Sequence, residues 1–183
     1  LAPPSECEGS IGPLLIGFSG GLDSSVLLHK LAAGNPARIR AIHVHHGLHA
    51  DADVWAAPCR ITCDSLGIEF IVDRVRIDDK GLGREGAARA ARHAAFARAL
   101  CDGEVLALAH HRDDQAETFL LRALRGSGVD GLAAMRPWRT YANGWLWRPL
   151  LETSRDALRE YAGAHGLSWI EDPSNDDTSF DRN

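Results

Sequence analysis

Residues 19–25, SGGLDSS, contain the residue types that bind a phosphate group together with a metal ion. The segment lies between two apolar runs, LLIGF and VLLHKLAA, which predict a buried strand followed directly by a helix. Gly20 and Gly21 allow the backbone to approach a phosphate without a Cβ clash, and the first amides of a helix favour an anion. Asp23 would repel a bare phosphate, so it predicts Mg²⁺ held between this carboxylate and the phosphates of a nucleotide.

A purely structural role for this loop is the alternative, with Asp23 capping the helix and the glycines turning the chain. Two better-known phosphate motifs are absent, because the sequence has no G-x-x-x-x-G-K-[ST] and no G-x-G-x-x-G after this strand. The complete S-G-G-x-D-S pattern between apolar runs favours a nucleotide site. We expect these loop residues to contact the nucleotide: Ser19, Gly20, Gly21, Leu22, Asp23 and Ser24.

A second cluster, HHRDDQAE at residues 110–117, follows the apolar run 105–109. Asp114 and Glu117 are three residues apart, so they share one face of the predicted helix. A carboxylate pair there could bind Mg²⁺, hold an ammonium group or act as a base. The alternative is a capped, solvated helix start whose acidic residues favour the helix dipole. The residues alone favour neither interpretation. The phosphate loop in the same chain favours the functional one.

Alternating elements must position these two motifs. Nearly continuous apolar runs predict strands buried on both faces at 14–18, 39–45, 68–75 and 105–109. Helical patterns occupy 24–33, 53–66, 84–100 and 113–124, and capping residues predict a further helix from Thr153 through His165. The alternation predicts an α/β fold with a doubly wound parallel sheet. Residues 126–149 read as loop.

Composition sets the class of protein. The 183 residues suffice for one domain, and a formal net charge of −5 argues against binding nucleic acid by bulk charge. The four cysteines, without a secretory signal, predict a cytoplasmic protein without disulfides. No apolar segment is long enough to span a membrane.

Three groups of side chains have both a functional and a structural interpretation. Cys59 and Cys63 are four residues apart without a partner pair, which favours thiols in the core over a metal site. Histidines 43, 45, 46 and 49 lie close enough in the sequence to suggest a metal site, but strand alternation directs 43 and 45 to one face and 46 toward another. Tryptophans 138, 145 and 147 favour packing over stacking on nucleobases. Arginines 122, 125, 136, 139 and 148 suit either an RNA backbone or an ordinary solvated surface.

The glycine loop resembles the pyrophosphate-binding PP-loop of the N-type ATP pyrophosphatases, and HHxDDQxET resembles their tRNA-modifying members. Residues 43–59, 125–137 and 148–183 resemble the tRNA(Ile)-lysidine synthetase family. The resemblance implies an adenine-nucleotide alpha-hydrolase-like fold, with ATP and Mg²⁺ as cofactors. It also implies that ATP adenylates the wobble cytidine of tRNA(Ile) with a CAU anticodon, and that free lysine then displaces AMP at C2 to give lysidine.

The same resemblance implies roles for particular residues. Asp23, Asp114 and Glu117 would be catalytic, with Asp23 as the metal ligand, and the backbone at His43 and Val44 would contact the adenine. Substrate contacts would come from His110, His111, Arg112, Asp114, Glu117 and Arg125. The family commonly has Asn at position 45, where this chain has His.

Residues 1–183 are expected to form one catalytic domain, with a core at about 14–125 and an extension at about 126–183. The natural chain is expected to continue into tRNA-binding regions, and the resemblance also allows a homodimer. A PP-loop tRNA 2-thiolase and a non-catalytic nucleotide-binding module are the alternative functions.

Overall fold

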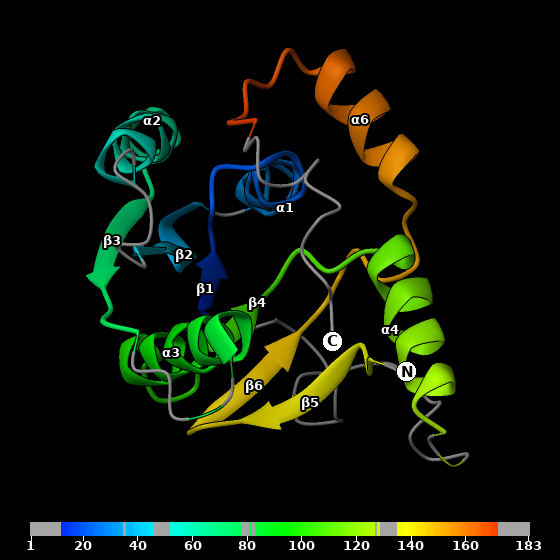
Figure 1. Ribbon diagram of the computed structural model, residues 1–183. Coiled ribbons are helices and arrows are strands. Elements are labelled where there is room, and N and C mark those ends of the chain that lie inside the picture. The colour runs from blue at the N-terminus through cyan, green and yellow to red at the C-terminus, as the bar shows by residue number, and fades with distance from the viewer. Residues whose placement is uncertain are drawn as a thin grey trace.

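The computed structural model of the chain describes residues 12–34, 36–45, 52–77, 81, 83–126, 128 and 135–171. Its centre is a six-stranded sheet with the strand order β3-β2-β1-β4-β6-β5 (Figure 1). All neighbouring strands are parallel except β5 and β6. The strands are β1 (Leu14–Gly17), β2 (Ile39–His45), β3 (Glu69–Arg74), β4 (Val105–Ala107), β5 (Trp138–Tyr141) and β6 (Gly144–Trp147).

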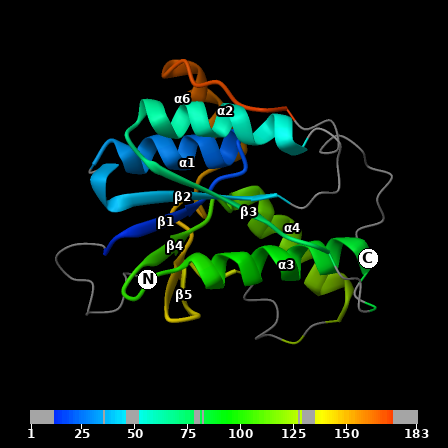
Figure 2. The ribbon, with the colours of Figure 1, turned by 90° about the vertical axis from the view of Figure 1, so that its left-hand side faces the viewer.

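Helices cover both faces of this sheet (Figure 2). They are α1 (Leu22–Ala32), α2 (Ala52–Ser65), α3 (Gly83–Ala99), α4 (Arg112–Leu124) and α6 (Arg155–Ala164), with a short 3₁₀ turn at Pro36–Arg38. Helices α1, α2 and α6 contribute to one hydrophobic core and α3 to the other. The doubly wound α/β prediction is therefore confirmed, and the predicted strands and helices end within about two residues of the observed ones. None of the helices within the described ranges has the length and apolarity to cross a bilayer.

Side-chain alternation assigns each strand residue to one of the two cores. On β4 and just beyond it, Val105, Ala107 and Ala109 belong to the core under α1, whereas Leu106 and Leu108 belong to the core under α3. This period of two is what a strand buried on both faces requires. It sets the direction of the side chains that follow β4.

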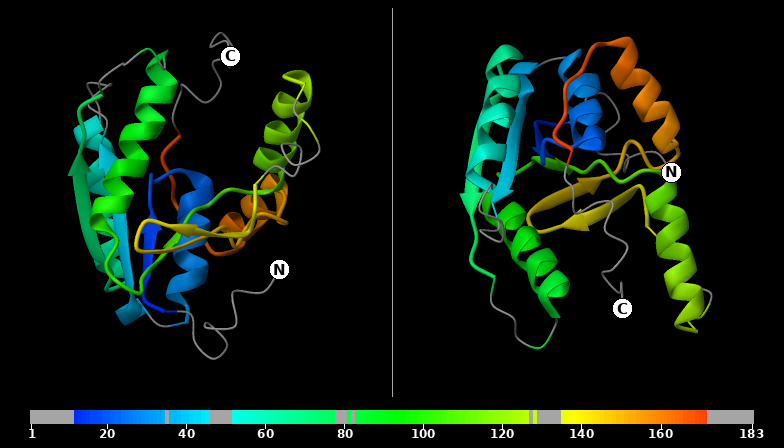
Figure 3. Two further views of the ribbon diagram at one scale, coloured as in Figure 1. Left: turned by 90° about the horizontal axis from the view of Figure 1, so that it is seen from below. Right: turned by 45° about the horizontal axis from the view of Figure 1, so that its top comes forward.

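The predicted loop at 126–149 is wrong for residues 138–147, which form the β5–β6 hairpin between α3 and α4 (Figure 3). Each strand has only four residues, which is too short for alternation to stand out from the sequence. Asn143-Gly144 is a usual hairpin signal, but the observed turn lies one residue earlier, with Ala142 at φ 47°. The strands form because β6 pairs in parallel with β4.

The packing interpretation of the three tryptophans is confirmed. Trp138, Trp145 and Trp147 pack against the core under α1. The rings of Trp138 and Trp147 stack with centroids 5.1 Å apart. These rings therefore hold the hairpin on the sheet instead of offering an open surface to nucleobases.

The order of the strands reverses between β1 and β4. From β1 the chain proceeds outward to β2 and β3, and it then returns to place β4 on the other side of β1. Ligands of open α/β sheets bind at the carboxyl ends of the strands at such a point. The glycine loop follows β1 and the histidine-acid cluster follows β4, so both motifs meet there.

Candidate active site

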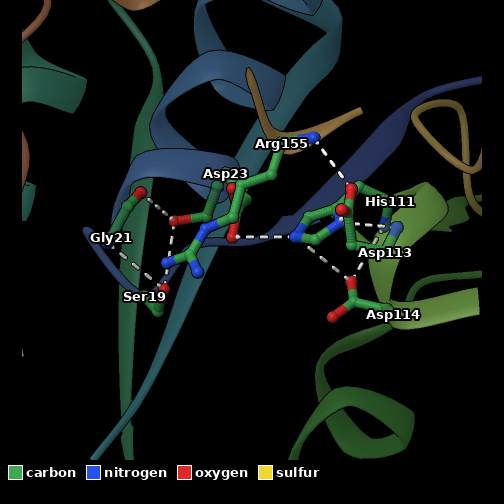
Figure 4. Close-up of polar contacts among 8 residues, drawn as sticks. Ser19, Gly21, Asp23, His111, Asp113, Asp114 and Arg155 are labelled. Atoms are coloured by element: carbon green, nitrogen blue, oxygen red, sulfur yellow. Dashed lines mark hydrogen bonds and ion pairs between the residues drawn. The ribbon is translucent and has the colours of Figure 1, made fainter. Parts of the chain in front are cut away.

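The glycine loop, residues 19–25, is held by its own serine hydroxyls. Ser24 donates to the carbonyl of Gly21 at 3.0 Å, and Ser25 donates to the carbonyl of Gly20 at 3.3 Å. Ser19 Oγ accepts from the amide of Gly21 at 3.3 Å (Figure 4). No described side chain caps the start of α1 at Gly21. The first amides of α1 therefore point to a position where an anion can bind.

Gly20 is the position in this loop that tolerates no side chain. Its φ is +87°, and a Cβ there would lie 2.7 Å from both Cys59 Sγ and Ile170 Cδ1. The amide of Ile170 also donates to the carbonyl of Gly20 at 2.9 Å. Ile170 thus lies against the glycine loop. No local pattern predicts this contact, because 150 positions of chain separate the two residues.

Asp23 has an unsatisfied oxygen. Its Oδ1 is buried and has no hydrogen-bond partner among the described residues. Its Oδ2 lies 3.6 Å from Nε2 of His111. A buried carboxylate oxygen without a donor is destabilising unless a ligand completes it, and a hard cation such as Mg²⁺ fits this oxygen. The described residues contain no group of three or more His, Cys, Asp or Glu arranged for a metal, so nucleotide phosphates would have to supply further ligands.

His111 joins Asp23 to the acidic start of α4. Its Nδ1 accepts the amide of Asp113 at 3.2 Å, and its own amide donates to Asp114 Oδ2 at 2.9 Å, which forms a capping box. Because Nδ1 accepts, the ring proton lies on Nε2, which is 3.6 Å from both Asp23 Oδ2 and Asp114 Oδ2. The interaction with Asp23, followed by the charges of Asp114 and Asp113, raises the pKa of His111.

Asp113 connects the start of α6 to the start of α4, beside His111. The amide of Arg155 donates to Asp113 Oδ2 at 2.9 Å, which is the main reason that the pKa of Asp113 is lowered. The amide of Arg112 donates to the carbonyl of Thr153 at 2.9 Å. In Figure 4 the side chain of Arg155 extends from this junction toward the glycine loop. The starts of α1, α4 and α6 therefore surround one small volume.

His110 points to the other side of the sheet. Its Nδ1 accepts from Arg148 Nε at 3.2 Å. Burial lowers the pKa of His110 to about 3, and the neighbouring charge of Arg148 adds to the effect. The two adjacent histidines therefore occupy opposite environments, with His111 among carboxylates and His110 among cations.

The buried His110 should make the stability of the fold sensitive to acid. An unfolded His110 takes up a proton near pH 6.5 but the folded one only near pH 3, so below 6.5 the unfolded state binds more protons. The free energy of unfolding should therefore fall as the pH drops from 6.5 toward 4. His110→Gln keeps a hydrogen-bond acceptor and should make this fall shallower in urea unfolding at pH 7 and pH 5. An unchanged slope would contradict the assignment.

His43 and Val44 lie on β2 beside the glycine loop. The His43 ring is buried with Nδ1 3.0 Å from the carbonyl of Phe18, and burial lowers its pKa. The β1–β2 register ends at Ile42, whose carbonyl accepts from Phe18. Since alternate residues of a parallel strand face the same neighbour, the main chain of Val44 faces the side on which β1 has ended. It is placed to contact a planar base through backbone groups. His46 and His49 lie outside the described residues.

The structure brings together most of the predicted site residues, with three exceptions. One is His110, which points to the other side of the sheet. Leu22 places its side chain in the core and only its backbone faces the site. Arg125 caps the far end of α4, about 20 Å along the helix axis from its start. Glu117 lies one turn after Asp114 on α4, and Arg112 is exposed at its start. Contacts to Arg125 would therefore require a ligand much larger than a nucleotide.

The prediction that the helix thiols face the core is confirmed. Cys59 and Cys63 are 1% and 0% exposed. Burial raises the pKa of Cys59 to about 11 and that of Cys63 to about 12. Both stay protonated at neutral pH, which makes them poor nucleophiles and poor metal ligands.

Comparisons with known proteins agree with this geometry. The family described as PP-loop domain matches residues 9–183. The chain is 64% identical over 176 residues to a tRNA(Ile)-lysidine synthase of Xanthomonas axonopodis pv. citri and 53% identical over 174 residues to one of Escherichia coli O157:H7. These alignments cover 94% and 93% of this chain, which spans 40% of the length of each of these relatives.

Two solved structures share the fold. The U34-tRNA thiolase NcsA of Methanococcus maripaludis, with its [4Fe-4S] cluster, has a TM-score of 0.67 at 21% identity. The alignment covers 87% of this chain and 59% of that one. The glutamine-dependent NAD⁺ synthetase of Acinetobacter baumannii, in complex with ADP, has a TM-score of 0.54 at 15% identity, with 87% and 30% covered.

Proposed function

The chain belongs to the family of PP-loop domains, and from that premise we propose that it is the catalytic domain of a tRNA(Ile)-lysidine synthase. The proposed reaction uses ATP to adenylate the wobble cytidine of a CAU anticodon, and free lysine then displaces AMP. One observation carries the proposal most directly: Asp23 of the glycine loop and Asp114 of α4 face the same imidazole nitrogen, that of His111. This arrangement would join a phosphate site to a site for a cationic amine. The identity to proteins of that name over nearly the whole chain supports the same assignment.

The glycine loop would bind the leaving pyrophosphate of ATP. Amides at the start of α1 are preorganised donors, which stabilise the charge that develops on phosphate oxygens. The main chain of Val44 would contact the adenine. Asp23 would hold Mg²⁺ through its unpartnered Oδ1. When bound, Mg²⁺ withdraws charge from the phosphates.

The acidic face of α4 would bind the amino acid. Asp114 and Glu117 are one turn apart on α4, so both carboxylates can face one ammonium group. The capping box fixes Asp114 through its Oδ2, and this limits its freedom to move toward other partners. His111 directs a ring nitrogen at the carboxylates of Asp23 and Asp114, and its proton would hold them in place during the reaction. One carboxylate could then accept the proton that the amine loses before attack.

Glu117→Gln should separate lysine binding from ATP binding. Losing the charge on one side of a paired ammonium removes about 1.5–3 kcal/mol. We therefore expect the KM for lysine to rise about tenfold or more while the KM for ATP changes less than about twofold. Steady-state AMP release by the full-length protein measures both. Glu160→Gln on the exposed surface of α6 is the matched control, and an equal rise in both constants for Glu117→Gln would remove this residue from the amine site.

Pyrophosphate release tests the proposed class of reaction. Full-length protein with ATP should release pyrophosphate when tRNA is added and AMP when lysine is added as well, and should need no sulfur donor. A requirement for sulfide or another sulfur donor would favour the tRNA 2-thiolase. ATP bound but not cleaved in the presence of tRNA and lysine would favour a nucleotide-binding module. Assembly into a homodimer stays a prediction.

A further inference from the structure

A group of cations lies on the α3 side of the carboxyl edge of the sheet, opposite the acidic site. We call it the arginine cluster, and its members are Arg89, Arg92, Arg139 and Arg148. They come from α3, from β5 and from the residue after β6. His110 lies beside them, because it accepts from Arg148. The PP-loop and the carboxylates do not use this cluster.

Strand alternation explains why the cluster forms. Arg139 is opposite Leu146 in the β5–β6 register, and Leu146 packs in the core under α3. Arg148 is two residues after Leu146, so it points to the same side. His110 is two residues after Leu108, which packs in that core too. The hairpin that the sequence did not reveal therefore places two arginines beside His110.

Arg148 is the central member of the cluster, with only 7% of its surface exposed. Its acceptors among the described residues are neutral: Nδ1 of His110 at 3.2 Å and the carbonyl of Arg136 at 2.6 Å. Burial, followed by the charges of Arg139 and Arg89, lowers the pKa of Arg148 to about 10. A buried guanidinium beside other cations is destabilising without an anion.

Other arginines in the same domain have carboxylate partners. Arg40 pairs with Glu104 at 2.6 Å, and Arg98, at the end of α3, pairs with Asp73 at 2.8 Å. Arg148 differs from these two in having neutral acceptors. An anionic ligand would supply a negative charge beside Arg148.

We propose that Arg148 and Arg139 bind a backbone phosphate of the RNA substrate beside the nucleotide that reacts. This inference rests on the proposed function for the identity of the RNA. Two observations favour an RNA phosphate over the phosphates of ATP. The glycine loop lies on the α1 side of the sheet, whereas Arg139 and Arg148 lie on the α3 side. Arg89 and Arg139 are exposed, so a ligand that extends beyond the protein can reach them.

The carboxyl edge of the sheet has an acidic side and a basic side, and this arrangement suits the proposed reaction. The acidic side at His111 attracts Mg²⁺ and an ammonium group, and the basic side at His110 attracts a phosphodiester. A nucleotide anchored by its phosphate at Arg148 would extend its base across the adjacent histidines toward the glycine loop. The two histidines come from consecutive positions of one extended segment, so their distance is fixed by the backbone.

Binding of a 17-nucleotide RNA hairpin with a CAU loop to the full-length protein tests the proposal, without ATP or lysine. Arg148→Met and Arg139→Met should each weaken binding about tenfold and reduce the slope of log affinity against log salt by about 0.7 to 1. Arg98→Met, on α3 but paired with Asp73, should change affinity less than about twofold. Arg139 is exposed, so its variant keeps the test valid if Arg148→Met fails to fold.

A second experiment identifies the RNA phosphate and distinguishes it from the phosphates of ATP. Neutral methylphosphonates placed singly in the loop should weaken binding to the parent protein at one position, and Arg148→Met or Arg139→Met should remove that sensitivity. ATP affinity should change less than about twofold in both variants. The proposal would be overturned if the methylphosphonates weakened binding at every position and the arginine variants left these losses unchanged. A loss of ATP affinity with unchanged hairpin affinity would overturn it too. Because no product is formed, failure of lysine transfer would leave this result intact.

Discussion

Asp23→Asn should reduce pyrophosphate release by about a hundredfold to a thousandfold. The substitution keeps the shape of the side chain but removes the charge that would hold a cation at Oδ1, and a metal contributes several kcal/mol at developing phosphate charge. It also removes the anion that faces His111 Nε2 at 3.6 Å. AMP and pyrophosphate release by the full-length protein, with saturating tRNA and lysine, is the measurement.

The fold should survive this substitution. Asp23 is not part of the hydrophobic core, and the described residues provide no hydrogen bond to its Oδ1. Asp64→Asn, on the exposed end of α2, is the matched control and should leave turnover unchanged. Turnover of Asp23→Asn within about tenfold of the parent protein would contradict a metal role for this carboxylate.

Gly20→Ala should damage the glycine loop more than a positive φ alone explains. Alanine in the left-handed region costs about 1–2 kcal/mol. At Gly20 the new Cβ would also lie 2.7 Å from Cys59 Sγ and Ile170 Cδ1, and such overpacking costs about 1–3 kcal/mol more. The loop would shift away from these two side chains, and the amides at the start of α1 would shift with it. We therefore expect pyrophosphate release to be lost.

Gly67→Ala provides the comparison for this prediction. Gly67 has a φ of +67° and nothing within 4 Å of the position a Cβ would take. Urea unfolding of both variants measures the difference, which should be about 1–3 kcal/mol in favour of Gly67→Ala. Equal losses of stability in the two variants would show that the contact with Ile170 and Cys59 does not restrict the loop.

The elements with long apolar runs could be predicted from the sequence because burial on both faces produces an unbroken pattern. Strands β1, β2 and β4 are of this kind, whereas β3 lies at the edge of the sheet and is only partly buried. The β5–β6 hairpin was not predicted, because its four-residue strands show too little alternation, although Asn143-Gly144 marks a turn there. It exists through pairing with β4, which is a contact across about forty residues of chain.

The residues of the candidate site also divide into those with a local sequence signal and those placed by contacts between distant segments. Residues within the two motifs were predictable, since Asp23, His111 and Asp114 belong to short patterns with their own chemistry. The contact of Ile170 with Gly20 and the position of Arg148 beside His110 depend on how distant segments pack. The sequence predicted His110 and His111 at one site, whereas the structure places them on opposite sides of the sheet, one acidic and the other basic.

Mass analysis of the modified nucleoside tests the proposed function most directly. The full-length protein is incubated with ATP, lysine and tRNA(Ile) bearing a CAU anticodon, and the tRNA is then digested to nucleosides. We predict that the wobble cytidine gains the mass of lysine less one water, that isotope-labelled lysine shifts this mass, and that Asp23→Asn abolishes it. An unmodified cytidine, or a nucleoside that has gained sulfur instead, would contradict the proposed function.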